Sequence, residues 1–265
     1  YRGAFHAERH FGIFALYQSF FPQILAGPIP RPGALLPQFR EKHELDFESI
    51  TEGLTRMAWG FFKKAVIADR AAIIVNAVFD HPHDYSGIYL ILASVLFSIQ
   101  IYCDFSGYSD IAIGAGRVLG FRLMENFRRP YLSRSMTEFW RRWHISLSTW
   151  FRDYLYIPLG GNRVKPARRQ FNLFVTFLLS GMWHGAGWNF IAWGALHGFL
   201  VVAGIWTARV RDVAARVSGL SRLPALHGKI KQAITFLFAA FAWIFFRANS
   251  LEDALYIAGN LGSGV

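Results

Sequence analysis

The chain has 265 residues, of which 53% are hydrophobic and 17% aromatic, and its formal net charge is +11. Its apolar residues gather in blocks, and several of these reach the ~20 residues that a helix needs to cross a bilayer; the blocks cover 11–29, 57–79, 87–121, 171–206 and 233–246. This pattern argues against a soluble domain and, despite the positive charge, against a nucleic-acid-binding protein. The sequence therefore predicts an all-α, polytopic helical membrane protein.

The first apolar block is interrupted by Pro22, Gly27 and Pro28. A run this short and this kinked predicts a broken or re-entrant helix, which is tolerated in a membrane only where protein or water covers the freed backbone. The chain begins with Tyr1 and stops at Val265, shortly after a new apolar segment starts. We expect 1–265 to be a single membrane domain, as a fragment that lacks N-terminal spans and the C-terminal end of a larger protein.

Residues 40–50 are polar and predict a solvent loop, followed by a helix over about 50–79 that Ser49 or Asp46 would cap. A turn-rich loop at 81–87 precedes the next apolar stretch, which starts at 88 and continues to 121. Asp104 and Asp110 lie within that stretch. They could bind a proton or a cation, but we favour a role in bracing a broken helix.

The positive charge is concentrated between 122 and 169, where eleven Arg and Lys residues stand against three acidic ones. A basic segment between membrane-length runs indicates a cytoplasmic loop and a site for anionic lipid. Within it we expect a helix over 135–153. We expect a second basic loop over 207–231 and a last apolar helix over 233–246.

The longest uncharged run, 171–206, contains 36 residues without Lys, Arg, Asp or Glu. As one helix it would be ~54 Å long, too long for a single untilted span of ~30 Å. If the basic segments on both sides are cytoplasmic, the run must enter and return. The sequence therefore predicts a hairpin with a break near 185–189.

Two histidines occupy this uncharged run. Ionisable side chains are rare within membrane segments and usually have a functional role there. His184 lies among glycines, which allow either close helix approach or a gap for a ligand. A histidine in a water-poor channel suits general base chemistry on a hydroxyl, because its pKa lies near working pH. The alternative is that His184 only makes a hydrogen bond between helices. His197 lies thirteen residues further on and would be far from His184 on a continuous helix, so a structural role is favoured for it.

A third histidine, His144, follows Arg141 and Arg142 in a basic, aromatic segment. Because it belongs to a different element, it could reach His184 by tertiary packing alone, or it could be an ordinary interfacial residue. A serine nucleophile is not expected, since no Gly-x-Ser-x-Gly motif is present. One cysteine, Cys103, excludes an intrachain disulfide and a cysteine-based metal site, and we expect no metal.

Four sequence motifs occur in this order along the chain: FFPQILAGPI at 20–29, YCDFSGYSD at 102–110, EFWRRWHISLS at 138–148 and MWHG at 182–185. Four motifs in a fixed order make a resemblance to a family specific. Together they resemble the membrane-bound O-acyltransferase family, in particular its alginate O-acetyltransferase branch, which is related to teichoic acid D-alanylation. The resemblance implies a helical membrane fold with broken or re-entrant helices around a central funnel. The signature histidine of the family corresponds to His184, and its second polar position to His144.

The resemblance further implies transfer of an acetyl or other acyl group from a cytoplasmic donor to a hydroxyl of an exported polysaccharide such as alginate. His184 would act as the base with His144 assisting, and Arg141, Arg142 and Trp183 would bind substrate. Acetyl-CoA or another acyl donor would be a substrate, with no tightly bound cofactor. The expected partners are membrane lipid, a periplasmic acetyltransferase protein and the polysaccharide, in the bacterial inner membrane.

Two other classes of function stay open. In a proton-coupled transporter or channel, the histidines, Asp104 and Asp110 would form a relay or line a pore. In a scaffold for a glycan synthase complex, neither histidine would matter.

Overall fold

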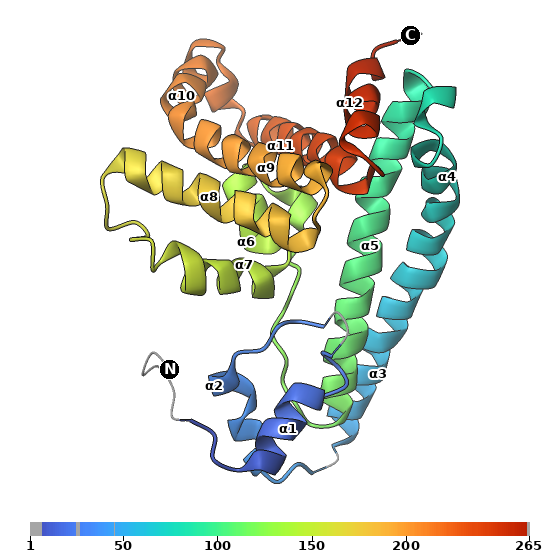
Figure 1. Ribbon diagram of the computed structural model, residues 1–265, viewed down its shortest axis with the longest axis vertical. Helices are drawn as coiled ribbons and strands as arrows, with labels where there is room; N and C mark the ends of the chain where they lie inside the picture. The colour runs from blue at the N-terminus through green and yellow to red at the C-terminus, as the bar shows by residue number, and fades with distance from the viewer. Residues whose placement is uncertain (1–6, 25–26, 45, 264–265) are drawn as a thin grey trace. The chain divides into compact units, whose positions relative to one another are not determined.

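The computed structural model describes residues 7–24, 27–44 and 46–263, and all regular structure in those ranges is helical (Figure 1). The chain divides into two compact units. The first comprises 1–70, 101–128 and 144–147, and the second comprises 71–100, 129–143 and 148–265. The prediction of an all-α protein is confirmed.

The first unit starts with a short helix, α1 (Phe11–Ser19), which ends before Phe20 and Pro22. The predicted interruption of this apolar block is confirmed; Leu25 and Ala26 lie outside the described residues. Two short turns of helix follow, α2 (Pro32–Leu35) and η1 (Pro37–Arg40). The Phe20 ring is buried against Phe39 and Phe121, with ring centroids 5.3 and 4.9 Å away, and this contact holds the segment in place.

The predicted helix over 50–79 is present as α3 (Phe47–Phe61), the π-helical turn η2 (Phe62–Ala68) and α4 (Asp69–Phe79). Asp46 is the cap, since its carboxylate accepts a hydrogen bond of 2.9 Å from the backbone N–H of Ser49. An acidic N-cap satisfies an amide that lacks a partner within the helix and stabilises the positive end of the helix dipole.

A second long helix, α5 (Ile88–Val118), runs without a break. The expectation that the helix is broken at Asp104 and Asp110 is therefore wrong. Glycines let α3 and α5 approach closely in the first unit. A Cβ added to Gly53 would lie 2.7 Å from the carbonyl oxygen of Gly114, and one added to Gly60 would lie 2.6 Å from that of Gly107. Small residues at regular spacing allow such backbone contact between membrane helices.

The single helix expected over 135–153 is wrong. The chain forms α6 (Met136–Arg142), breaks at Trp143 and His144, and continues as α7 (Ile145–Phe151) and the π-helical turn η5 (Arg152–Tyr156). The break arises because His144 has φ of +42°, a left-handed conformation that residues other than glycine rarely adopt.

The predicted hairpin over 171–206 is confirmed in the second unit. α8 (Pro166–His184) and α9 (Trp188–Trp206) lie side by side and are joined by a turn at 185–187 (Figure 1). Gly181 makes their contact possible, since a Cβ there would lie 2.3 Å from the carbonyl oxygen of Phe190 and 3.0 Å from the Cα of Gly194. The glycines near His184 thus serve close helix approach.

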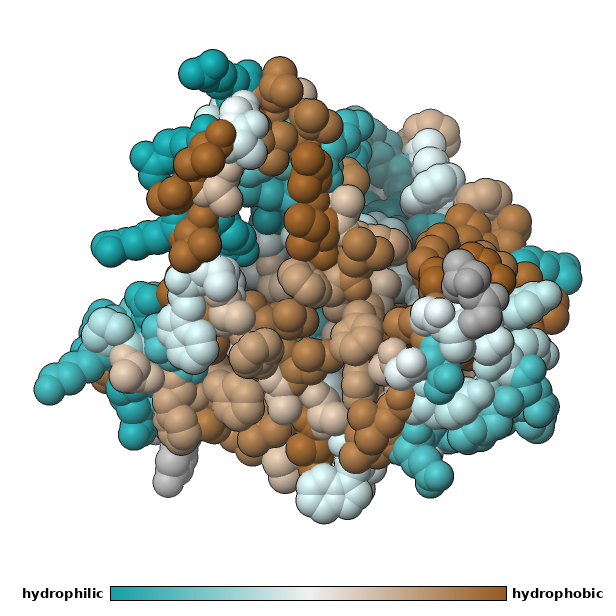
Figure 2. Space-filling view, turned by 90° about the horizontal axis from the view of Figure 1, so that it is seen from above, coloured by the Kyte–Doolittle hydropathy of each residue, from teal (hydrophilic) through white to brown (hydrophobic). Residues whose placement is uncertain are grey.

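The expected basic loop over 207–231 is mostly helical. It contains α10 (Ala208–Val217), the turn η6 (Leu220–Arg222) and the start of α11 (Pro224–Arg247), which α12 (Leu251–Asn260) follows. Short turns also occur at η3 (Pro82–Asp84) and η4 (Pro130–Leu132). Among the described residues, α5, α9 and α11 are long and apolar enough to cross a membrane. Hydrophobic side chains cover much of the face seen in Figure 2.

Candidate functional site

His184 is the last residue of α8, at the turn of the hairpin. Its Nδ1 lies 2.7 Å from the backbone carbonyl oxygen of Ser180. A carbonyl oxygen can only accept, so Nδ1 carries the hydrogen and donates it. In a neutral imidazole the lone pair then resides on Nε2. The backbone of α8 therefore fixes which nitrogen of His184 can act as a base.

Aromatic rings fix the plane of the His184 side chain. Trp183, Trp193 and Phe246 lie with their ring centroids 4.9, 5.0 and 5.4 Å from that of His184, all in edge-to-face arrangements. Trp183 itself is 59% exposed, whereas Trp193 is buried. The His184 ring thus contacts one buried and one exposed tryptophan.

His197 is fully buried in α9 and has the opposite tautomer. The indole N–H of Trp140 lies 3.3 Å from His197 Nδ1, and an indole N–H can only donate. Nδ1 is therefore the acceptor, and the hydrogen of the neutral ring resides on Nε2. Nε2 is enclosed and has no hydrogen-bond partner among the described residues. His197 presents no lone pair that could act as a base, which agrees with the structural role expected for it.

The two histidines of the hairpin both contact the ring of Trp193. The Trp193 ring centroid is 4.8 Å from that of His197 and 5.0 Å from that of His184. The break at 185–187 brings them together, because it folds α9 back along α8. Trp193, which contacts both rings, was not singled out in the sequence, since it reads as an ordinary apolar helix residue.

The two arginines proposed for substrate binding occupy the last turn of α6. Arg142 forms an ion pair of 2.5 Å with Glu138, and Glu138 also accepts from the backbone N–H of Arg134 at 2.8 Å. Ser135 caps the same helix by accepting from the N–H of Glu138. Arg142 therefore helps to stabilise the start of α6, whereas Arg141 is exposed.

In the first unit, His144 belongs to a buried polar cluster around Asn126. Asn126 Oδ1 lies 3.1 Å from His144 Nδ1 and accepts from the backbone N–H and the hydroxyl of Ser146 at 3.2 and 2.9 Å. The Asn126 amide also donates to Ser109 Oγ at 3.2 Å. Because Oδ1 accepts, His144 Nδ1 carries the hydrogen, as His184 Nδ1 does. Sequence reasoning missed Asn126, because a single asparagine in a basic segment forms no recognisable motif.

The intramembrane aspartates are paired with cations of the first unit. Asp110 forms ion pairs with both Lys63 and Arg56, and Arg56 forms a second ion pair of 2.6 Å with Glu125. Lys64 pairs with Asp104 at 2.6 Å and with Asp69 at 2.8 Å. These carboxylates therefore tie α5 to α3 and η2. Lys63 also donates to Ser106 Oγ at 2.9 Å.

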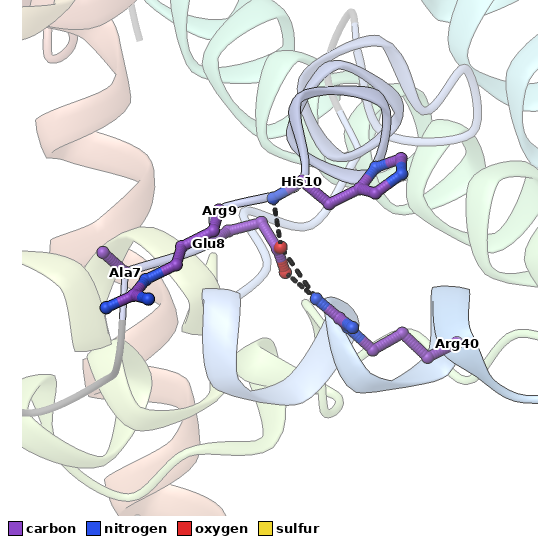
Figure 3. A pocket seen from close by; sticks show the side chains of 5 residues that line it. All are labelled: Ala7, Glu8, Arg9, His10 and Arg40. Carbon is purple, nitrogen blue, oxygen red and sulfur yellow. Dashed lines mark hydrogen bonds and ion pairs between the residues drawn. The ribbon is translucent and has the colours of Figure 1, made fainter.

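A hollow of about 510 Å³ lies on the first unit and is lined by Ala7, Glu8, Arg9, His10 and Arg40 (Figure 3). Arg40 forms a hydrogen-bonded ion pair with Glu8 there, and this contact lowers the pKa of the glutamate. The hollow contains none of the predicted site residues. Within the described residues, no three His, Cys, Asp or Glu side chains gather in a group that could hold a metal ion.

His184, His197, Trp183, Arg141 and Arg142 thus all belong to the second unit, and His144 belongs to the first. The pairing of His144 with His184 stays a prediction.

The order of motifs, the helical fold and the histidine at the turn of an apolar hairpin agree with a comparison to known proteins. Residues 10–248 match the family model of the membrane-bound O-acyltransferases. The chain belongs to this family. It is 45% identical over 255 residues to a protein of Pseudomonas aeruginosa named "probable alginate O-acetylase AlgI", with 96% of this chain and 46% of the relative covered.

Two further relatives show the range of the family. The chain is 43% identical to a peptidoglycan O-acetyltransferase of Helicobacter pylori, with 96% of this chain and 47% of the relative covered. It is 28% identical to a teichoic acid D-alanyltransferase of Streptococcus thermophilus, with 80% and 55% covered. The chain spans about half the length of these curated relatives.

Proposed function

We propose that this chain carries the acyl-transfer site of a membrane O-acyltransferase that modifies a hydroxyl of an exported polysaccharide. Relatives named for alginate and for peptidoglycan O-acetylation support the class of acceptor, and we favour alginate or a similar polymer. The donor is a cytoplasmic acyl thioester such as acetyl-CoA. The protein is a multi-pass protein of the bacterial inner membrane, and a periplasmic acetyltransferase acts as its partner.

The observation that carries this proposal is the hydrogen bond from His184 Nδ1 to the Ser180 carbonyl oxygen. It leaves Nε2 as the basic nitrogen at the turn of the hairpin. In the proposed reaction, Nε2 removes the proton of the acceptor hydroxyl while the hydroxyl oxygen attacks the acyl carbonyl carbon. The carbon–sulfur bond breaks, and the leaving thiolate takes the proton back from the imidazolium.

The other predicted residues take supporting roles in this proposal. Trp183, exposed beside His184, would line the approach of the acyl group. Arg141 would attract the anionic donor, because it is exposed, whereas Arg142 is engaged by Glu138. His144, with its Nδ1 held by Asn126, would assist through its own Nε2.

The test compares His184→Gln with His197→Gln in the full-length protein, expressed in cells at equal levels. Transfer of radiolabelled acetyl groups to polymer should be lost, by about a hundredfold or more, in His184→Gln, because glutamine cannot act as a base. His197→Gln should retain transfer per folded molecule. Equal activity of His184→Gln and the unmodified protein would refute the role of His184.

The alternative is a transporter or channel that uses Asp104 and Asp110 as a relay. The ion pairs of both aspartates with lysine and arginine count against it, since these contacts give the carboxylates a structural role between α5, α3 and η2. Proton or ion flux through reconstituted protein without acyl transfer would favour this alternative.

A further inference from the structure

The helix α10, which follows the apolar hairpin, has one apolar side that no part of the described chain covers. Val210, Val213 and Val217 are 69%, 52% and 84% exposed. At 100° per residue these three side chains fall within about 60° of arc. Ala215, the buried residue of α10, lies on the opposite side. The valine ridge therefore points directly away from the second unit.

Basic residues border this ridge. Arg209 and Arg216 fall along one side of it and Arg211 along the other, and all three are exposed. The α10 backbone and the end of α9 keep two of them in place, since Arg211 donates to the carbonyl oxygen of Gly204 at 2.8 Å and Arg216 to that of Asp212 at 3.3 Å. An apolar ridge between arginines is the pattern of a helix that lies in a membrane interface.

The position of α10 in the chain agrees with this pattern. It begins two residues after Trp206, which ends the membrane-span candidate α9 and is 60% exposed. Exposed tryptophans concentrate at the level of the lipid headgroups. A short helix that starts where a span ends would thus lie at the membrane surface.

We propose that α10 lies in the bilayer interface and binds anionic lipid, with the valine ridge among the upper acyl chains and the arginines at the phosphates. The charge decides between lipid and protein as the occupant. A ridge covered by another protein segment has no need of arginines on both borders, whereas each arginine near an anionic surface adds affinity of about fivefold. This proposal is independent of the acyl-transfer reaction.

The test uses the full-length protein in nanodiscs, with a nitroxide attached to Val213→Cys or Val217→Cys, and with Asp212→Cys as the matched control from the same helix. Within residues 1–265 the one native cysteine, Cys103, is buried. Collision rates with oxygen, which concentrates in lipid, and with a water-soluble nickel chelate report the surroundings of each label. We expect a higher oxygen-to-nickel ratio at 213 and 217 than at 212 in phosphatidylglycerol-containing discs. This ratio should fall in phosphatidylcholine discs or with Arg209→Gln and Arg216→Gln together.

Three results would overturn the proposal. Immobile labels at 213 and 217 that neither reagent reaches would show that protein covers the ridge. Nickel accessibility equal to that at 212 would show that the ridge faces water. An oxygen-to-nickel ratio that is the same in both kinds of disc would exclude a preference for anionic lipid.

Discussion

At the scale of single residues, the three histidines differ in which ring nitrogen carries the hydrogen. Backbone and amide oxygens accept from Nδ1 of His184 and His144, whereas an indole donates to Nδ1 of His197. The first two rings therefore keep a basic Nε2 and the third does not. The sequence singled out all three histidines and favoured a structural role for His197. It could not show which ring nitrogen carries the hydrogen, because the hydrogen-bond partners come from other elements or from backbone groups.

A prediction for His197 follows from its hydrogen bond with Trp140. His197→Leu should lower the free energy of unfolding by about 1–3 kcal/mol, because it leaves the part-buried indole N–H of Trp140 without an acceptor. His197→Asn should restore much of this loss, since its amide oxygen can accept the same hydrogen. Thermal unfolding in detergent measures both variants. Equal stability of the leucine and asparagine variants would contradict the role of this hydrogen bond.

A second prediction concerns Asn126, the fully buried centre of the His144 cluster. Asn126→Ala removes the acceptor of three hydrogen bonds and should cost about 1–3 kcal/mol for each donor left unpaired. Ser109→Ala, which removes one partner of the same amide, should cost less. Chemical denaturation of the two variants provides the comparison. A larger loss in Ser109→Ala than in Asn126→Ala would refute the central place of the amide.

At the scale of elements, the apolar hairpin and the helix over 50–79 could be predicted, because run length, charge and capping residues determine them locally. The helix over 135–153 could not be predicted correctly. Its sequence favours a continuous helix, but the backbone N–H of Ile145 donates to the Asn126 carbonyl oxygen, and the Asn126 side chain holds His144 and Ser146. Those contacts fix the left-handed conformation at His144 that ends α6, and they connect residues eighteen to twenty positions apart.

The glycine contacts between α3 and α5 make a prediction at this scale. Gly53→Ala should destabilise the protein by about 1–3 kcal/mol, because the added Cβ meets the Gly114 carbonyl oxygen and the helices must separate. Gly204→Ala in α9 is the matched control, since a Cβ there meets nothing within 4 Å. The control should be neutral or stabilising by up to about 1 kcal/mol. A similar loss in both variants would show that tight helix approach is not the cause.

A further prediction concerns Asp80, which binds Arg247 at 2.9 Å and thereby connects the end of α4 to the end of α11. The arginine lowers the pKa of the Asp80 carboxyl. A carboxyl with a lowered pKa in the folded state stabilises the fold above its unfolded pKa of about 4 and loses this effect as the pH falls below that value. Asp80→Asn should therefore be less stable than the unmodified protein at pH 7, with the difference shrinking below about pH 4. A difference that does not change with pH would contradict the ion pair.

At the scale of the whole molecule, membrane class and family could be predicted from the sequence, because both depend on long apolar runs and ordered motifs. The secondary structure of the second basic segment could not be predicted. Residues 207–231 read as a loop by charge, yet α10 forms because alanines and arginines favour helix and the valines recur three and four residues apart. Positive charge alone therefore does not distinguish a loop from an amphipathic helix.

The hairpin makes a prediction for the topology of the second unit. α8 and α9 each have 19 residues and a length of about 28 Å. Because they lie side by side and run in opposite directions, we expect the basic start of α8 and the helix α10 to lie on the same side of the membrane. Positive segments favour the cytoplasm, so both should be cytoplasmic. His184 then lies at the far end of α8 from the basic residues, where an acceptor arriving from outside could meet it.

Cysteine labelling in intact cells and inverted vesicles tests this arrangement. Lys165→Cys, before α8, and Ser218→Cys, after α10, are both exposed positions and should react with a membrane-impermeant maleimide only in inverted vesicles. Ala186→Cys, in the exposed turn beside His184, should not react from the cytoplasmic side. Labelling of 165 and 218 from opposite sides would require that only one of the two helices crosses the bilayer, and the hairpin would then not place His184 away from the basic face.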